Sequence, residues 1–173
     1  APEPDTKRYE QIEANKGNLY LSGAAIFNKD RMVGKIPLDE LPYYRLLEEK
    51  KGVLSETVVV NGKMIQVRGV KPKVKRKLKM GAGIPEWDVK IKINVQLLND
   101  ESSSRLTTSE IKRIENAFNK QVEEKCTAVF HKALQNDWDL FGLQNRIKYK
   151  RGRQWEMFRN TETGWKQTKL RIN

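Results

Sequence analysis

The chain has 173 residues, 38% of them hydrophobic and 32% charged, which fits one folded domain and excludes a wholly disordered protein. Its 34 lysines and arginines outnumber its 22 aspartates and glutamates, and the formal net charge of +12 favours anionic partners such as nucleic acid, acidic protein surfaces or anionic membranes. Cys126 and His131 are the single residues of their types, which excludes an internal disulfide, a four-cysteine zinc site and a multi-histidine metal site. No apolar stretch approaches the roughly 20 residues that span a bilayer.

Residues 1–17 are polar and contain two early prolines, so we expect a linker with a short helix around residues 9–16. They carry neither the basic nor the apolar segment of a secretion signal, and the chain does not begin with methionine. We therefore expect a processed protein or a piece of a longer one. Residues 18–173 are expected to form a single α+β domain, in which an antiparallel or mixed β-sheet packs against one long α-helix, with short additional helices.

The domain is predicted to open with a hairpin and a short helix. Apolar residues 19–27 and 32–36 flank a polar turn, which is typical of a β-hairpin. We then expect Asp39 to cap a short helix that Gly52 ends.

A second hairpin is predicted from residues 53–60 and 63–70, which are rich in valine. They flank Asn61-Gly62, a pair that supplies the two positive φ angles of a type I′ turn. This is the strongest short-range signal in the sequence.

Beyond Pro72 the sequence alternates with period two, so that five lysines fall on one face of a strand. These residues are Lys71, Lys73, Lys75, Lys77 and Lys79. After a turn at residues 81–85, a strand over residues 89–97 carries Lys90 and Lys92 on its polar face. Like charges at this spacing repel one another, so we expect them either to protect a sheet edge from aggregation or to contact an anionic membrane or partner.

A long amphipathic helix is predicted to begin after Thr107 and to run to about residue 136. Thr107 and Glu110 have the spacing of a capping box. One apolar stripe recurs every three or four residues, and we expect it to pack on the apolar face of the strand over residues 89–97. The stripe comprises Ile111, Ile114, Phe118, Val122, Cys126, Val129, Phe130 and Ala133. Short helices and a last strand at residues 169–172 are expected to follow.

The residue types that carry catalysis are scarce and poorly placed. Cys126 and His131 are separated by about 500° of helical rotation, so they do not share a helix face as a catalytic dyad would. Gly81 and Gly83 complete neither a dinucleotide-binding nor a phosphate-binding motif. We therefore expect a non-enzymatic protein that has no catalytic, metal-binding or cofactor-binding residues.

One segment near the end of the chain supports an alternative function. Tyr149 and Trp155 flank a basic run, and exposed rings among basic groups suit base stacking in nucleic-acid binding. In the competing interpretation, both rings pack against the core while the basic side chains stay in solvent.

Three segments together resemble a known family. Residues 21–27, with the sequence LSGAAIF, and residues 29–36, with the sequence KDRMVGKI, resemble the opening of the C-terminal domain of the Ger(x)C family. Residues 138–143, with the sequence WDLFGL, resemble the D-x-F-G stretch that precedes a basic segment and a tryptophan in that family. Its members are the lipoprotein C subunits of bacterial spore germinant receptors.

This resemblance implies a non-enzymatic domain that takes part in receptor assembly and nutrient-triggered spore germination. It implies membrane-spanning A-type and B-type receptor subunits as partners and a lipid-anchored full-length protein on the outer face of the spore inner membrane. It implies no cofactor and no catalytic residue. The lysine-rich strands would suit an anionic lipid surface, and a basic nucleic-acid-binding domain remains the alternative.

Overall fold

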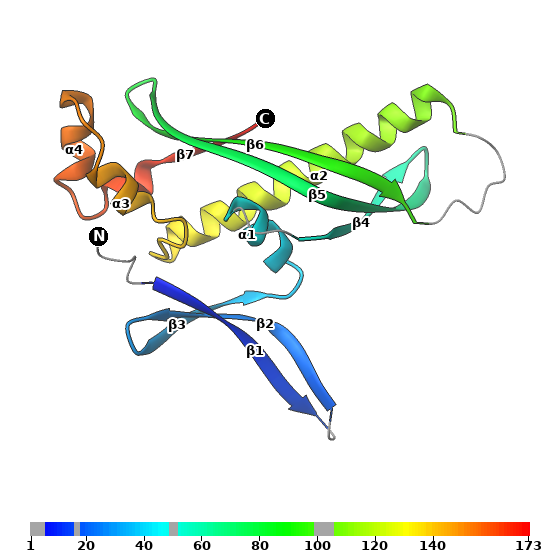
Figure 1. Cartoon of the computed structure of the whole chain (residues 1–173), viewed down its shortest axis with the longest axis horizontal. Coiled ribbons are helices and arrows are strands. Elements are labelled where there is room, and N and C mark those ends of the chain that lie inside the picture. The colour runs from blue at the N-terminus through cyan, green and yellow to red at the C-terminus, as the bar shows by residue number, and fades with distance from the viewer. Residues whose placement is uncertain (1–5, 16–17, 49–51, 99–105) are drawn as a thin grey trace.

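The structure is a computed structural model that describes residues 6–15, 18–48, 52–98 and 106–173. It has the expected α+β architecture, with two β-sheets, one long helix and several short helices (Figure 1). A three-stranded sheet lies below the long helix in this view, and a four-stranded sheet passes in front of that helix.

The three-stranded sheet is antiparallel and has the order β1-β2-β3. It comprises β1 (Thr6–Asn15), β2 (Asn18–Asn28) and β3 (Arg31–Pro37). The expected linker with a short helix is therefore wrong for residues 6–15, because β1 pairs with β2 along its whole length. Pairing with the next strand along the chain satisfies the backbone donors and acceptors of β1, and the polar composition of residues 6–15 gives no sign of it.

The expected hairpin and short helix are confirmed, with one shift in the cap. β2 and β3 form the hairpin, and Lys29 takes a positive φ of 56° in its turn. Helix α1 (Leu41–Leu47) has Glu40 at its N-cap, so the expected cap at Asp39 is wrong by one residue. The helix ends at Leu47, before Gly52.

The four-stranded sheet has the order β4-β5-β6-β7 and is mixed, because β7 runs parallel to β6 while the other pairs are antiparallel. Its strands are β4 (Leu54–Val60), β5 (Lys63–Gly81), β6 (Ile84–Leu97) and β7 (Lys169–Ile172). The turn between β4 and β5 falls at Asn61 and Gly62, with φ angles of 54° and 77°. This confirms the expected hairpin, and β5 continues through residue 70 into the lysine-rich segment without a break.

A β-bulge interrupts the ladder between β5 and β6. Val70 pairs with Asn94, and the next pair joins Lys73 to Lys92, so that three steps along β5 match two steps along β6. Lys71, in the bulge, has a φ of 52°. The next residue, Pro72, has no backbone N–H, and a bulge is one of the few places inside a strand where its absence is tolerated.

The bulge changes which residues of β5 face the core. Before it, Val67 and Gly69 are buried, and after it Leu78 is buried while Val74 is half-buried. The buried positions therefore change from odd to even residue numbers. On β6 the buried positions Pro85, Trp87 and Val89 are all odd, and the half-buried residues Ile91, Ile93 and Val95 continue this series beyond the bulge.

The long helix α2 (Thr108–Gln135) begins with the expected capping box. The backbone N–H of Glu110 donates to Oγ1 of Thr107 at 3.2 Å, and the backbone N–H of Thr107 donates to Oε2 of Glu110 at 2.8 Å. The apolar stripe is buried from Ile114 onward, whereas Ile111 is 44% exposed because the first turn extends past the sheet. Among the described residues, no helix is both long and apolar enough to cross a bilayer.

An aromatic cluster lies at the centre of the core. Trp87 of β6 contacts Phe130 of α2 and Phe141 beyond α2, with ring centroids 5.6 Å and 5.0 Å apart. Phe141 also lies 5.5 Å from Tyr44 of α1 and 5.7 Å from Phe130. The strand over residues 89–97, which is part of β6, was expected to pack on the apolar stripe of the long helix. This is confirmed, since inward residues of β6 and α2 belong to one core.

The end of the chain folds into short helices that precede β7. They are α3 (Leu143–Lys148), η1 (Arg153–Trp155), α4 (Glu156–Arg159) and η2 (Gly164–Gln167). Asp139 caps α3 by accepting the backbone N–H groups of Leu143 at 2.6 Å and Gln144 at 2.9 Å. Burial raises the pKa of this carboxyl, in opposition to the two hydrogen bonds, which favour its ionised form.

The three-stranded sheet meets the rest of the domain at a glycine. A Cβ atom added at Gly34 of β3 would lie 2.0 Å from Cζ2 of the buried Trp138. A side chain at position 34 therefore cannot be accommodated without moving the indole or the strand.

We expect Gly34→Ala to lower the free energy of unfolding by about 1–3 kcal/mol, because the added methyl group overpacks this contact. The measurement is chemical denaturation followed by tryptophan fluorescence. Gly52→Ala is the matched control, since nothing lies within 4 Å of a Cβ added there. Equal effects of the two substitutions would contradict the assigned contact.

Candidate functional site

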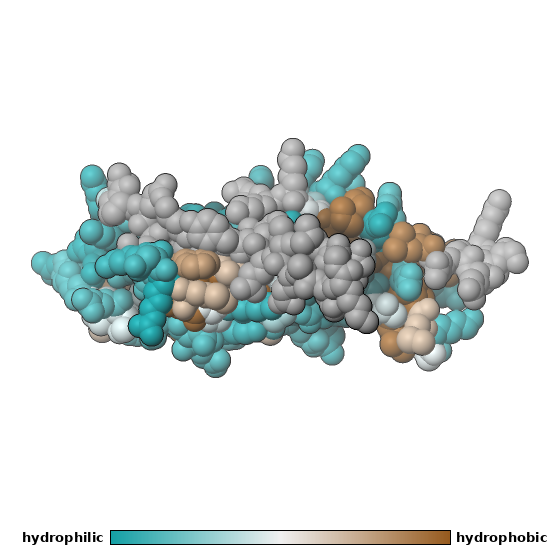
Figure 2. All heavy atoms as spheres, turned by 90° about the horizontal axis from the view of Figure 1, so that it is seen from below, coloured by the Kyte–Doolittle hydropathy of each residue, from teal (hydrophilic) through white to brown (hydrophobic). Residues whose placement is uncertain are grey.

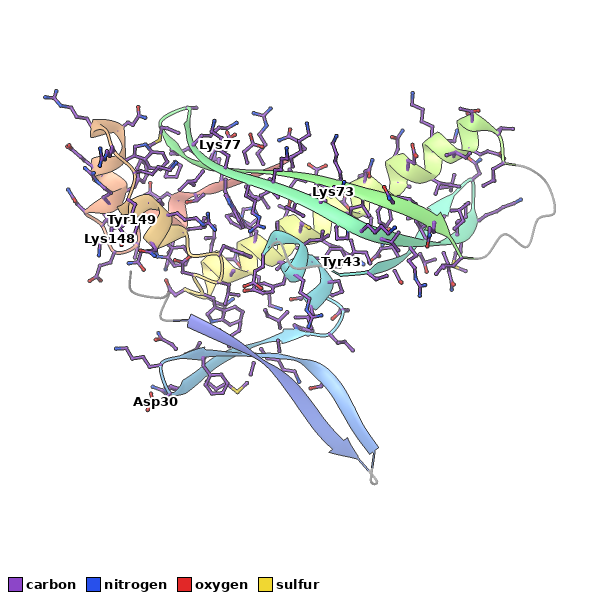
Figure 3. All side chains as sticks on the ribbon, in the orientation of Figure 1. Asp30, Tyr43, Lys73, Lys77, Lys148 and Tyr149 are labelled. Carbon is purple, nitrogen blue, oxygen red and sulfur yellow. The ribbon has the colours of Figure 1, made fainter. Side chains whose placement is uncertain are left out.

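The most unusual surface of the domain lies on the β5–β6 hairpin. Lys73 lies directly opposite Lys92, and Lys75 lies directly opposite Lys90. Together with Lys77, these exposed residues form what we call the lysine face, on the side of the two strands that points away from the core. Figure 3 shows Lys73 and Lys77 spaced along β5.

The remaining two predicted residues differ from these five. Lys71 is exposed but lies in the bulge, outside the paired rows. Lys79 is half-buried, and its ammonium group pairs with Asp88 at 2.8 Å and Glu86 at 3.0 Å. Its hydrogen bond to Asp88, followed by that to Glu86, raises the pKa of Lys79, and the same bond to Lys79 lowers the pKa of Asp88. The charge of Lys79 is therefore neutralised within the domain.

The geometry of the lysine face is electrostatically unfavourable for an isolated domain. Directly opposed side chains have Cβ atoms roughly 5 Å apart, and like charges in such pairs destabilise a sheet. Among the described residues, none of the five lysines forms an ion pair. A bound anionic surface would remove this repulsion, so the face is suited to binding one.

Edge protection stays open as the alternative explanation for these lysines. β4 pairs with β5 only from Lys63 to Gly69, so the lysine-bearing part of β5 has an open edge. Lysines near an open edge discourage pairing with another chain. This explanation gives no reason to place two lysines directly opposite each other.

The lysine face includes a shallow, open hollow of about 370 Å³. Its lining comprises Lys75, Arg76, Lys77, Asp88, Lys90 and Asn173. The acidic member, Asp88, is held by Lys79 and accepts a hydrogen bond from Nδ2 of Asn173 at 2.7 Å. The hollow thus retains a surplus of positive charge and can accept a phosphate-sized anionic group.

Several basic residues near this face were not predicted. Arg68 of β5 is exposed and pairs with Gln96, on the side of β6 that also carries Lys90 and Lys92. Lys169 and Arg171 extend the charged side onto β7, beside Glu86 and Asp88. The alternation of residues 63–70 could have indicated that Arg68 is exposed. No local sequence pattern indicates the parallel pairing of β7 with β6, so the positions of Lys169 and Arg171 could not be predicted.

Cys126 and His131 do not form a site. Cys126 is completely buried, and its burial raises the pKa of the thiol to about 12. His131 is exposed on the surface of α2 and contacts the edge of Phe130. The structure therefore separates the two residues, as their spacing predicted.

The basic aromatic segment presents one ring and not two. Tyr149 is 61% exposed, beside Lys148 at the end of α3 (Figure 3). Trp155 is only 4% exposed and packs in the core, with the ammonium group of Lys150 over its ring at 5.6 Å. A stacking platform that needs both rings is therefore not available.

Comparisons with known proteins agree on one family. The family model described as "Spore germination B3/GerAC like, C-terminal" matches residues 22–173. The spore germination protein GerQC of Bacillus cereus is 25% identical over 141 residues, which cover 79% of this chain and 39% of that protein.

A solved structure, the crystal structure of the GerBC protein, superimposes with a TM-score of 0.80 at 20% sequence identity. The alignment covers 97% of this chain and 54% of that one, and it shows a shared fold. The chain thus spans 39% of the length of the curated relative and about half the length of the solved one.

We expect Lys75→Glu to raise the free energy of unfolding by about 0.3–1 kcal/mol at low ionic strength, because it replaces a repulsive pair with an attractive one. Urea denaturation measures the change, which should shrink in 1 M salt, where the Debye length falls to about 3 Å. The double substitution Lys75→Glu/Lys90→Glu restores a like-charged pair and should lose the gain. A larger gain in the double variant would assign the effect to net charge instead.

Cys126 should not react with a thiol reagent while the domain is folded. With a pKa of about 12, roughly one thiol in ten thousand is ionised at pH 8, and burial denies the reagent access. Labelling with a chromogenic disulfide reagent should be fast only after unfolding in urea. Rapid stoichiometric labelling of the native chain would contradict this assignment.

Proposed function

The chain belongs to the C-terminal domain family of spore germination B3/GerAC-like proteins, and from this premise we propose that it is a binding and assembly domain of a germinant receptor C subunit. The resemblance to that family is confirmed, because the family model matches residues 22–173. In this proposal the domain has no catalytic role and acts in the step from nutrient detection to germination. Its partners are the membrane-spanning A-type and B-type receptor subunits.

The observation that carries the proposal is the lysine face. Opposed lysines lower the stability of the isolated domain, so their placement is explained if the charges are used in binding. The inward side of β5 and β6 packs against the core, which includes the aromatic cluster. The charged side chains on the other side of both strands therefore share one exposed surface.

We propose that the lysine face contacts anionic lipid beside the receptor. In the proposed location, the outer face of the spore inner membrane, a lipid anchor on the full-length protein would hold the domain close to phospholipid headgroups. Each basic group near such a surface contributes about 1 kcal/mol of attraction, and the attraction falls off within a Debye length. The hollow beside Lys75 and Lys90 is large enough for a headgroup phosphate.

The test is co-sedimentation of the chain with vesicles that contain phosphatidylglycerol. We expect Lys73→Gln/Lys75→Gln/Lys90→Gln/Lys92→Gln to weaken binding by more than about a hundredfold at low salt, because four such contributions are lost. Binding of the unchanged chain should fall steeply as salt rises.

A matched control removes four exposed lysines from other surfaces: Lys29→Gln/Lys112→Gln/Lys120→Gln/Lys148→Gln. Both quadruple variants carry a net charge of +8, from the formal +12 of the chain. The control should bind nearly as well as the unchanged chain. Equal loss in both variants would reduce the effect to net charge and overturn the assignment to the lysine face.

Receptor assembly is tested in spores. The full-length C subunit that carries the four lysine-face substitutions should recover less A-type and B-type subunit on affinity purification, and nutrient-triggered germination should slow. Normal recovery and normal germination would overturn the role of the face in assembly. The comparisons give no support to the nucleic-acid alternative.

A further inference from the structure

An apolar pair lies at the tip of the β4–β5 hairpin, on the same side of the sheet as the lysine face. Val59 and Met64 are directly opposed in the ladder, next to the Asn61-Gly62 turn, and are 65% and 80% exposed. Their neighbour Val58 is fully buried, so Val59 and Met64 point away from the core. Figure 2 shows apolar residues gathered near the end of the molecule where this hairpin lies in Figure 1.

A third apolar side chain extends this tip. Leu98 is exposed and follows the end of β6, and its backbone N–H donates to the carbonyl of Gln66 at 2.9 Å. The alternation of β6 places it on the side that carries Lys90 and Lys92. We call Val59, Met64 and Leu98 the apolar tip.

Among the described residues of β4–β6, no acidic side chain lies on the outward surface between the apolar tip and the lysine face. On the outward side of the three strands, the intervening positions are Ser55, Thr57, Gln66, Arg68, Val70, Asn94 and Gln96. The acidic residues on this side of β4–β6, Glu86 and Asp88, lie at the opposite end of the hairpin, where both pair with Lys79. Charge is thus segregated along the sheet.

We propose that the apolar tip inserts into the interfacial region of an anionic bilayer while the lysine face binds its headgroups. Apolar side chains next to a basic surface match a membrane interface, where apolar groups are buried at the boundary of the headgroups and acyl chains. Met64 and Lys73 are about 30 Å apart along the strand, so the sheet lies along the membrane and contacts it at both sites. This inference rests on the proposed function, and it adds a second, hydrophobic contact.

The test places an environment-sensitive fluorophore on the tip. Met64→Cys is labelled with a nitrobenzoxadiazole dye, and the buried Cys126 stays unlabelled in the folded chain. Vesicles that contain phosphatidylglycerol should shift the emission to shorter wavelength and raise its intensity several-fold, whereas vesicles of phosphatidylcholine alone should not. The same dye at Lys112→Cys on α2 should remain in water in both cases.

A second pair of variants measures what the tip contributes to binding. Val59→Ser/Met64→Gln should weaken binding to anionic vesicles by roughly tenfold and leave the stability of the domain unchanged, because both side chains are exposed. Val33→Ser/Met157→Gln is the matched control, since it removes exposed side chains of the same types elsewhere. The control should bind as the unchanged chain does.

The outcomes separate the two proposals. If the dye-labelled chain co-sediments with anionic vesicles but its emission does not change, the tip stays in water and this inference is overturned, while lipid binding by the lysine face stands. If the chain binds no vesicles at all, both fail. A tip that inserts equally into phosphatidylcholine vesicles would overturn the coupling to anionic headgroups.

Discussion

Four aromatic rings from distant parts of the sequence hold this domain together. Trp87 of β6 contacts Phe130 of α2 and Phe141 of the following segment, and Phe141 contacts Tyr44 of α1. Because Trp87 is fixed on the inner side of β6, the outer side of the same strand must face solvent. The exposure of the lysine face is thus a consequence of packing on the opposite side of the strand, and the surface and the core are coupled through one element.

The sequence predicts best those elements that have local signals. The Asn61-Gly62 turn and the capping box of Thr107 and Glu110 were both expected from their residue types, because each is stabilised by the conformation or hydrogen bonds of a few consecutive residues. β1 has no such signal. Its pairing depends on the edge of β2, and a polar segment with early prolines is indistinguishable from a linker until that partner is known.

The candidate site could be predicted in part. Alternation identified which residues of β5 and β6 share a face, but it could not place Lys73 opposite Lys92, because the register between strands is a tertiary property. It also could not show that Lys79 meets Asp88 and Glu86 across the hairpin. The burial of Trp155 likewise depends on contacts with distant segments.

The bulge at Lys71 divides β5 into two segments. Odd-numbered residues face the core before the bulge, and even-numbered residues face it afterwards. If β5 ran as a regular strand through Lys71 and Pro72, with no bulge, the odd-numbered positions that face inward at Val67 and Gly69 would continue inward through Lys73 and Lys75. The polarity of the whole sheet therefore depends on one backbone insertion as well as on side-chain composition. An alignment of related sequences must therefore take this insertion into account. If it does not, residues beyond the bulge are matched to positions on the opposite face of the sheet.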